Sequence, residues 1–121
     1  MDRLTALYKG KVKFVFIYGS EGHPGSYDQP DDPRAPRYGT KTYADRVGAA
    51  HLFQEVHDVH RQILVDAFDR ESVRYRYGIQ DGNPLVVIGA DERIIHHEKY
   101  ANARALGSFL NEYLQHAGLP Q

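Results

Sequence analysis

The residues best suited to chemistry in this sequence are an acid and a histidine two positions apart, Glu21 and His23. They follow an apolar and aromatic run that ends at Tyr18, so we expect them at the carboxyl end of a β-strand. Ligands of open α/β sheets usually bind at that end. A carboxylate beside an imidazole can fix its tautomer and favours proton transfer near neutral pH. Glu21 and His23 are therefore a candidate proton-donating or substrate-orienting pair, and a purely structural turn is the alternative.

A second chemistry to weigh is metal binding, because the chain has seven histidines. His57 and His60 are one helical turn apart, which can place both imidazoles beside one metal ion. A transition-metal site needs three or four converging ligands, and this pair is incomplete. His96 and His97 are adjacent on an expected strand and so point to opposite faces. Solvated helix histidines explain the pair more simply, so we predict no metal site.

Cysteine chemistry is excluded from this sequence, because it contains no cysteine. Its residues can form no disulfide, no zinc–thiolate site and no thiol nucleophile. No cofactor is predicted.

Length and composition indicate one domain over residues 1–121, and the order of its expected strands and helices indicates the α/β class. The formal net charge is −1, and basic and acidic residues are mixed. This pattern offers no basic stripe for phosphates, so nucleic-acid binding is not expected. The apolar runs are too short to span a bilayer, and no signal peptide is recognisable, so a cytoplasmic location is expected.

The expected elements alternate between strands and helices. The apolar residues Phe14–Ile17 lie on both faces of their strand, which predicts a strand covered on both sides. Thr42 is a predicted helix cap, and Ala49, Leu52, Phe53 and Val56 give the helix that follows one apolar face. The predicted segments are a helix over 3–9, a strand over 11–18, a Pro/Gly-rich loop over 19–40, a helix from 42 to about 60, a strand over 62–66, a short helix over 69–77, a hairpin over 84–98 and a helix over 103–116.

The stretch Tyr18-Gly19-Ser20-Glu21-Gly22-His23-Pro24 resembles the Tyr-x-x-Glu-Ala-His-Pro signature of the iodothyronine deiodinase-like branch of the thioredoxin superfamily. The resemblance implies a thioredoxin-like mixed sheet flanked by helices. It also places Asn83-Pro84 where that superfamily has a cis-proline, and the sequence leaves cis and trans both open. The candidate substrate- or ligand-binding residues are Tyr18, Tyr27, Asn83 and Pro84.

The resemblance has a gap that bears on function. In that family the redox-active selenocysteine or cysteine lies upstream of this strand, at the head of the first helix. Neither the first core strand nor the start of that helix has a counterpart in this sequence. We therefore expect a binding or assembly module, or part of a reductase. The alternatives are a thiol- or selenol-dependent reductase completed by an upstream segment or partner, with Glu21 and His23 in its site, and histidine-based metal binding. Since the missing strand would be central, we expect self-association or a partner segment to fill its place.

Overall fold

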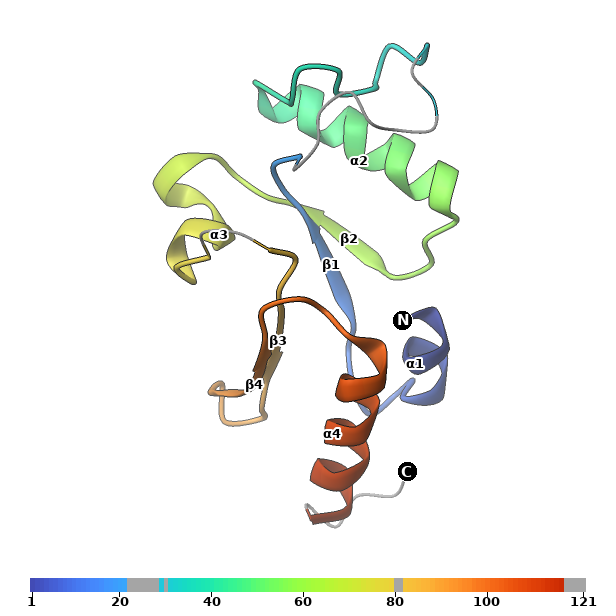
Figure 1. Ribbon diagram of the computed structural model, residues 1–121, viewed down its shortest axis with the longest axis vertical. Helices are drawn as coiled ribbons and strands as arrows, with labels where there is room; N and C mark the ends of the chain where they lie inside the picture. Colours follow the sequence, from blue (N-terminus) through green and yellow to red (C-terminus); the bar gives the residue numbers. More distant parts are fainter. Residues whose placement is uncertain (22–28, 30, 80–81, 117–121) are drawn as a thin grey trace. The chain divides into compact units, whose positions relative to one another are not determined.

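The chain has an α/β fold in which its strands form two small sheets (Figure 1). The computed structural model describes residues 1–21, 29, 31–79 and 82–116. Two compact units divide them: residues 13–78, which we call the β1–β2 unit, and the described residues of 3–12 and 79–121, which we call the hairpin unit. The elements are α1 (Asp2–Leu7), β1 (Val15–Tyr18), α2 (Tyr43–His57), β2 (Gln62–Val65), the 3₁₀ helix η1 (Asp69–Glu71), α3 (Val73–Arg76), β3 (Leu85–Ile88), β4 (Ile94–Glu98) and α4 (Ala103–His116).

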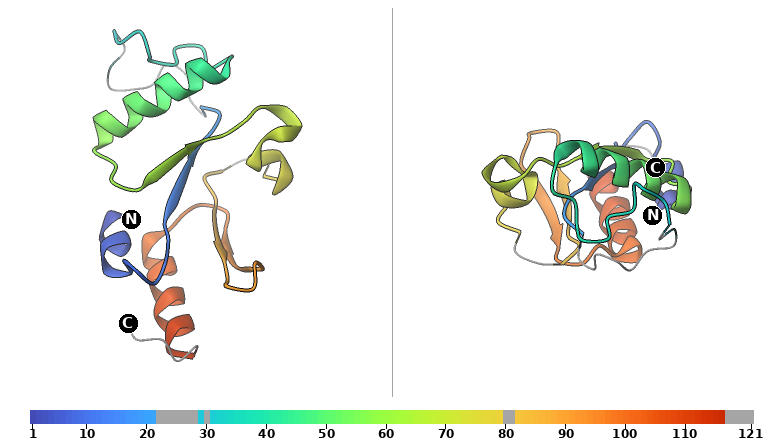
Figure 2. Two further views of the ribbon diagram at one scale, coloured as in Figure 1. Left: turned by 180° about the vertical axis from the view of Figure 1, so that it is seen from behind. Right: turned by 90° about the horizontal axis from the view of Figure 1, so that it is seen from above.

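In the β1–β2 unit the two strands pair in parallel, with Val15 opposite Gln62 and Tyr18 opposite Val65. Helix α2 lies along one face of this pair, as Figure 2 shows from behind. The contact is aromatic: the Phe16 ring stacks on Phe53 of α2 at 5.1 Å between centroids, and Tyr18 lies 5.9 Å from the same ring. Such pairs contribute about 0.5–1.5 kcal/mol beyond the area that they bury.

The other face of β1 differs from the expectation. Val15 and Ile17 are 40% and 41% exposed, and Leu64 of β2 is 47% exposed. Side chains alternate along a strand, so the residues that meet α2 are Phe16 and Tyr18, and their neighbours point away from it. The prediction that Phe14–Ile17 is covered on both sides is therefore wrong for Val15 and Ile17.

Helix α2 begins as the sequence predicts. The Thr42 hydroxyl accepts a hydrogen bond from the Asp45 N–H at 3.1 Å, which satisfies one of the free amides at the helix start. The buried side chains include Ala49 and Leu52 of the predicted stripe. The helix ends at His57, earlier than predicted, because Asp58 adopts a left-handed conformation with φ of 49°.

The hairpin unit contains β3 and β4, which pair antiparallel as predicted, with a bulge between Val87 and Ile88. Helix α4 spans the predicted residues, and its start is capped by the Asn102 side chain, which accepts from the Ala105 N–H. The buried stripe of α4 consists of Leu106, Leu110 and Leu114. No described residue has a cis peptide bond, so Asn83-Pro84 is trans.

The described strands pair as two two-stranded sheets, one in each unit. Of the described strands, β1 pairs with β2 and β3 pairs with β4, so neither β1 nor β3 has a second neighbour among them. Among the described residues, no helix is long and apolar enough to cross a membrane.

We predict that Leu110→Ala lowers the free energy of unfolding by about 2–5 kcal/mol, since it leaves a cavity at a side chain that is only 2% exposed. Urea denaturation followed by circular dichroism measures the loss. The matched control is Leu7→Ala, because Leu7 is 63% exposed and its truncation should change stability by less than about 0.5 kcal/mol. Equal losses in the two variants would contradict this account of the core.

Candidate functional site

The carboxyl ends of β1 and β2 carry a connected group of polar residues, which we call the Arg46 network. Tyr18 ends β1 and Glu21 follows it, while Asp66 comes directly after β2. Arg46 reaches this edge from the first turns of α2, and Thr40 comes from the end of the preceding loop. The network is thus built from both strand ends and the two segments between them: Tyr18, Glu21, Thr40, Arg46 and Asp66.

Glu21 acts as an acceptor in this network. Its Oε1 accepts from the Tyr18 hydroxyl at 3.1 Å, and its Oε2 accepts from the Thr40 N–H at 3.0 Å and the Thr40 hydroxyl at 3.2 Å. Partial burial, with the nearby charge of Glu21, raises the pKa of Tyr18 well above its usual value. Tyr18 therefore stays protonated at neutral pH and serves as a donor, and Glu21 joins the end of β1 to the end of the long loop.

Arg46 is buried, with 5% of its surface exposed. Its Nη1 donates to the backbone carbonyls of Asp66 and Ala67 at 3.1 and 2.8 Å, and its Nε donates to the Thr40 hydroxyl at 3.1 Å. The guanidinium carbon lies 3.7 Å from the centroid of the Phe68 ring, a cation–π contact. The Arg46 side chain of α2 thus fixes the backbone that follows β2. Through Thr40 it also fixes the end of the loop to which Glu21 is bonded.

Asp66 completes the network with its carboxylate. Oδ1 accepts from the N–H groups of Ala67 and Val73 at 2.9 and 2.8 Å, and Oδ2 accepts from the Arg74 N–H at 3.3 Å. These amides belong to the segment that turns into α3, so the buried acid organises the start of that helix as an N-terminal cap does. The Asp66 carboxylate is therefore occupied by hydrogen bonds from backbone N–H groups of its own chain.

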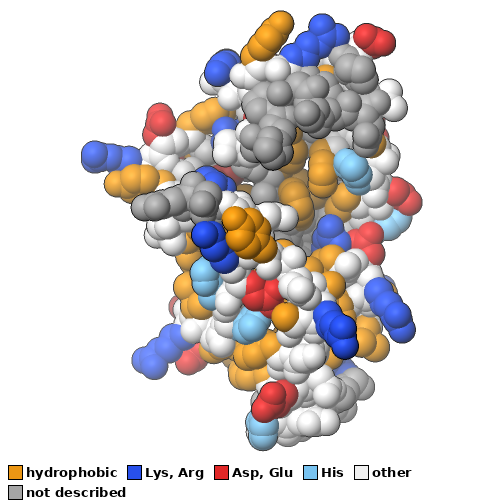
Figure 3. Space-filling view, in the orientation of Figure 1, with side chains coloured by type: hydrophobic (Ala, Val, Ile, Leu, Met, Phe, Trp, Pro, Cys, Tyr) orange, Lys and Arg blue, Asp and Glu red, His pale blue; other side chains and the backbone are white. Residues whose placement is uncertain are grey.

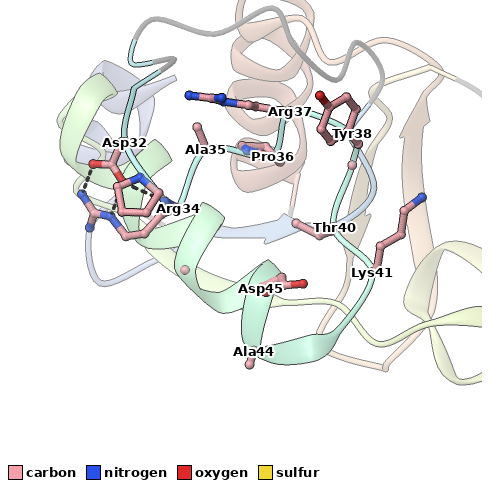
Figure 4. A pocket seen from close by; sticks show the side chains of 13 residues that line it. Asp32, Arg34, Ala35, Pro36, Arg37, Tyr38, Thr40, Lys41, Ala44 and Asp45 are labelled. Carbon is pink, nitrogen blue, oxygen red and sulfur yellow. Dashed lines mark hydrogen bonds and ion pairs between the residues drawn. The ribbon is translucent and has the colours of Figure 1, made fainter.

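A hollow of about 780 Å³ lies beside the network, between residues 32–41 and the first half of α2 (Figure 4). Its outer wall is tied to α2 by Arg34, which donates to both carboxylate oxygens of Glu55 at 2.9 and 2.8 Å and also bonds Asp32. At the other end of this wall, the Thr40 N–H donates a hydrogen bond to Glu21. Hydrogen bonds from Arg34 hold the pKa of Asp32 and of Glu55 below their usual values.

Of the residues predicted from the sequence, the structure brings together Tyr18 and Glu21. His23 and Tyr27 lie outside the described residues, so the acid–histidine pair stays a prediction. Asn83 and Pro84 belong to the hairpin unit. There the carbonyl of Asn83 accepts from the Ala101 N–H at 2.7 Å, which gives Asn83 a backbone role at the opening of β3.

The histidines do not assemble a metal site in the described part of the chain, where no group of three or more potential His, Cys, Asp or Glu ligands gathers. The His57 ring packs on Phe53 at 4.7 Å. His60 is largely exposed and lies 3.3 Å from Asp58.

On the face drawn in Figure 3, Lys and Arg side chains are scattered among acidic and apolar ones.

Sequence reasoning missed Arg46 as a buried residue. A signal was present, because Arg46 lies three positions before Ala49 and thus continues the apolar stripe of α2 by one turn. It also missed His96, whose Nε2 lies 2.6 Å from Oε2 of Glu98, two residues along the same face of β4. The His96 ring stacks on Phe109 of α4 at 4.3 Å.

Comparisons with known proteins identify no relative. No family model matches the chain, and no match was found among curated proteins or solved structures.

We predict that Arg46→Lys lowers the free energy of unfolding by about 1.5–3 kcal/mol, because an ammonium cannot reproduce the planar fork that binds two carbonyls and Thr40. Denaturant unfolding measures the loss. Arg76→Lys is the matched control in the same unit, since Arg76 is largely exposed and pairs with Glu71, which is largely exposed too. A loss no larger than that of the control would contradict the role given to Arg46.

The ties of Arg34 predict a response of the loop to acid. Folding lowers the pKa values of Asp32 and Glu55 from 3.8 and 4.5. Their contribution to the stability of the loop is therefore complete above those pH values. It is lost as the pH falls through the lower folded values. The amide resonances of Gly39 and Gly48, followed by NMR during acidification, should report this loss, since Gly48 lies against Arg34. In Arg34→Gln the same resonances should be displaced already at neutral pH. Unchanged resonances in that variant would contradict the tie.

Proposed function

We propose that this chain is a binding and assembly module that holds an extended apolar segment along the open edge of β1. It supplies no thiol chemistry, because its sequence has no cysteine. The observation that supports this function is the pairing of β1, which has β2 on one side and no other described strand beside it. An unpaired strand edge presents N–H and C=O groups that another strand can use.

The groups at the open edge follow from the register. The Tyr18 carbonyl accepts from the Asp66 N–H at 2.8 Å, so Tyr18 directs its backbone groups toward β2. Successive residues of a strand direct these groups to opposite edges. Phe16 thus also faces β2, and Val15 and Ile17 direct their N–H and C=O groups to the open edge. These two residues are the docking positions for an added strand.

The side chains at the same positions favour an apolar occupant. The side chains of Val15 and Ile17 are 40% and 41% exposed, and that of Leu64 on β2 is 47% exposed. β-Branched side chains stabilise a strand chiefly through neighbours on the same face of the sheet. An occupant with Val, Ile or Leu at alternate positions would supply those neighbours, as a polar one would not.

The Arg46 network supports the proposal by fixing β1 in place. Tyr18 is bonded to Glu21, which is bonded to Thr40, and Arg46 holds Thr40 and the end of β2. A pre-organised edge loses little conformational entropy when it binds. A thioredoxin-like arrangement, which is part of this proposal, would place a central strand along the same edge.

The proposal predicts that a synthetic peptide of alternating valine and threonine, blocked at both ends, shifts the amide resonances of Val15 and Ile17 and slows their hydrogen exchange. Val15→Pro should abolish the shift and the slowed exchange at Ile17, because it removes one N–H at the open edge and leaves the pairing of Phe16 and Tyr18 with β2 intact.

The matched control peptide has the same sequence except for a proline at its centre, which disrupts its pairing. Ile17→Lys gives a second variant at an exposed side chain, should Val15→Pro fail to fold. Absence of shifts at millimolar peptide, or equal shifts in the wild type and both variants, would show that β1 does not accept a strand.

A further inference from the structure

We infer that the outer edge of β2 is a second strand-binding site, which takes an extended peptide segment that carries a leucine-sized aliphatic side chain. This inference goes beyond the proposed function, because it concerns the opposite edge of the same strand pair and adds selection for one side chain. Two separate observations lead to it: the open edge of β2, and a small cavity beside that edge.

The backbone groups at the outer edge follow from the register. β2 pairs with β1 and with no other described strand. The Asp66 N–H donates to the Tyr18 carbonyl, so Asp66 and, two residues earlier, Leu64 direct their backbone groups toward β1. Ile63 and Val65 therefore direct their N–H and C=O groups to the outer edge. Among the described residues, neither takes part in a backbone hydrogen bond outside the β1–β2 pair.

An open cavity of about 100 Å³ lies between this strand and α2. Its lining from β2 consists of the same two residues, Ile63 and Val65. Its lining from α2 falls at positions i, i+3, i+4 and i+7, which form one face of the helix: Val47, Ala50, His51 and Gln54. The Phe53 ring, which packs on Phe16 of β1, is not part of this face.

The edge and the cavity can act on one peptide. A strand added to β2 would lie about 4.8 Å from it, and its side chains would alternate between the two faces of the sheet. The side chains on the α2 face would stand next to Ile63 and Val65, where the cavity lies. In this mode of binding the main-chain hydrogen bonds supply affinity, and a pocket for alternate side chains supplies specificity.

The lining selects this side chain by charge and by size. It contains no Asp, Glu, Lys or Arg, so a charged side chain would lose its hydration there without meeting an opposite charge. His51 and Gln54 are exposed, and their polar atoms can stay in contact with water when the apolar part is filled. A cavity of about 150 Å³ accommodates benzene, so this smaller one suits a single branched aliphatic side chain.

A synthetic peptide of one leucine with threonines on both sides, blocked at both ends, tests the inference. At millimolar concentration it should shift the amide resonances of Ile63 and Val65 in the full chain and slow their hydrogen exchange. The matched control peptide has serine in place of the leucine. It should bind about tenfold more weakly, because it leaves the cavity without an apolar side chain.

Two variants of the chain alter the cavity. Val47→Asp places a carboxylate in the lining and should weaken the binding of the leucine peptide about tenfold. Gln54→Trp narrows the cavity from an exposed position and gives a second test should Val47→Asp fail to fold. Ala44→Asp is the matched control, because it adds the same acid one turn earlier on α2, at an exposed residue that does not line this cavity. It should leave the affinity unchanged.

The outcomes separate this site from the edge of β1. Absence of shifts at Ile63 and Val65 would overturn the inference, whereas the proposed function depends on the shifts at Val15 and Ile17 and is judged separately. Equal affinity for the leucine and serine peptides would show that the cavity takes no side chain, which also overturns the inference. Binding that is unchanged in both cavity variants would do the same.

Discussion

The β1–β2 unit depends on one buried cation. Removing the Arg46 guanidinium from water costs free energy that only well-placed partners can offset. Those partners are two backbone carbonyls beyond β2, the Thr40 hydroxyl and the face of Phe68. None of them belongs to α2 itself, so the charge is satisfied only when the loop, the strand end and the helix are all in place. Arg46 thereby couples the formation of these segments.

This constraint explains how the polar residues at the strand ends are used. Glu21 and Asp66 occupy the edge where α/β proteins usually bind ligands, yet both carboxylates accept hydrogen bonds from their own chain. At that edge, in the part of the chain that the structure describes, acids serve to fix backbone. The exposed apolar side chains of β1 are Val15 and Ile17, along the strand rather than at its end.

Local signals predicted local structure well. The Thr42 cap, the β3–β4 hairpin and the limits of α4 were all predicted, because capping, alternation and helical spacing act over a few residues. The exposure of Val15 and Ile17 was not, since it depends on which elements lie beside β1. The burial of Arg46 depends on carbonyls twenty positions away, and no local rule carries that information. His96 and Glu98 share a face of β4, which alternation predicts, but the stacking of His96 on Phe109 of α4 joins residues of two different elements, which alternation along one strand does not predict.

An open strand edge is a hazard as well as a binding surface, because any extended chain can pair with it. Proteins limit such pairing with bulges, prolines or charges at the edge. Strand β3 has a bulge between Val87 and Ile88, whereas β1 pairs with β2 in a regular register. Near β1 the exposed charge is Lys13, two residues before the strand. A charge repels chains of like sign at that position but attracts one that brings a carboxylate there.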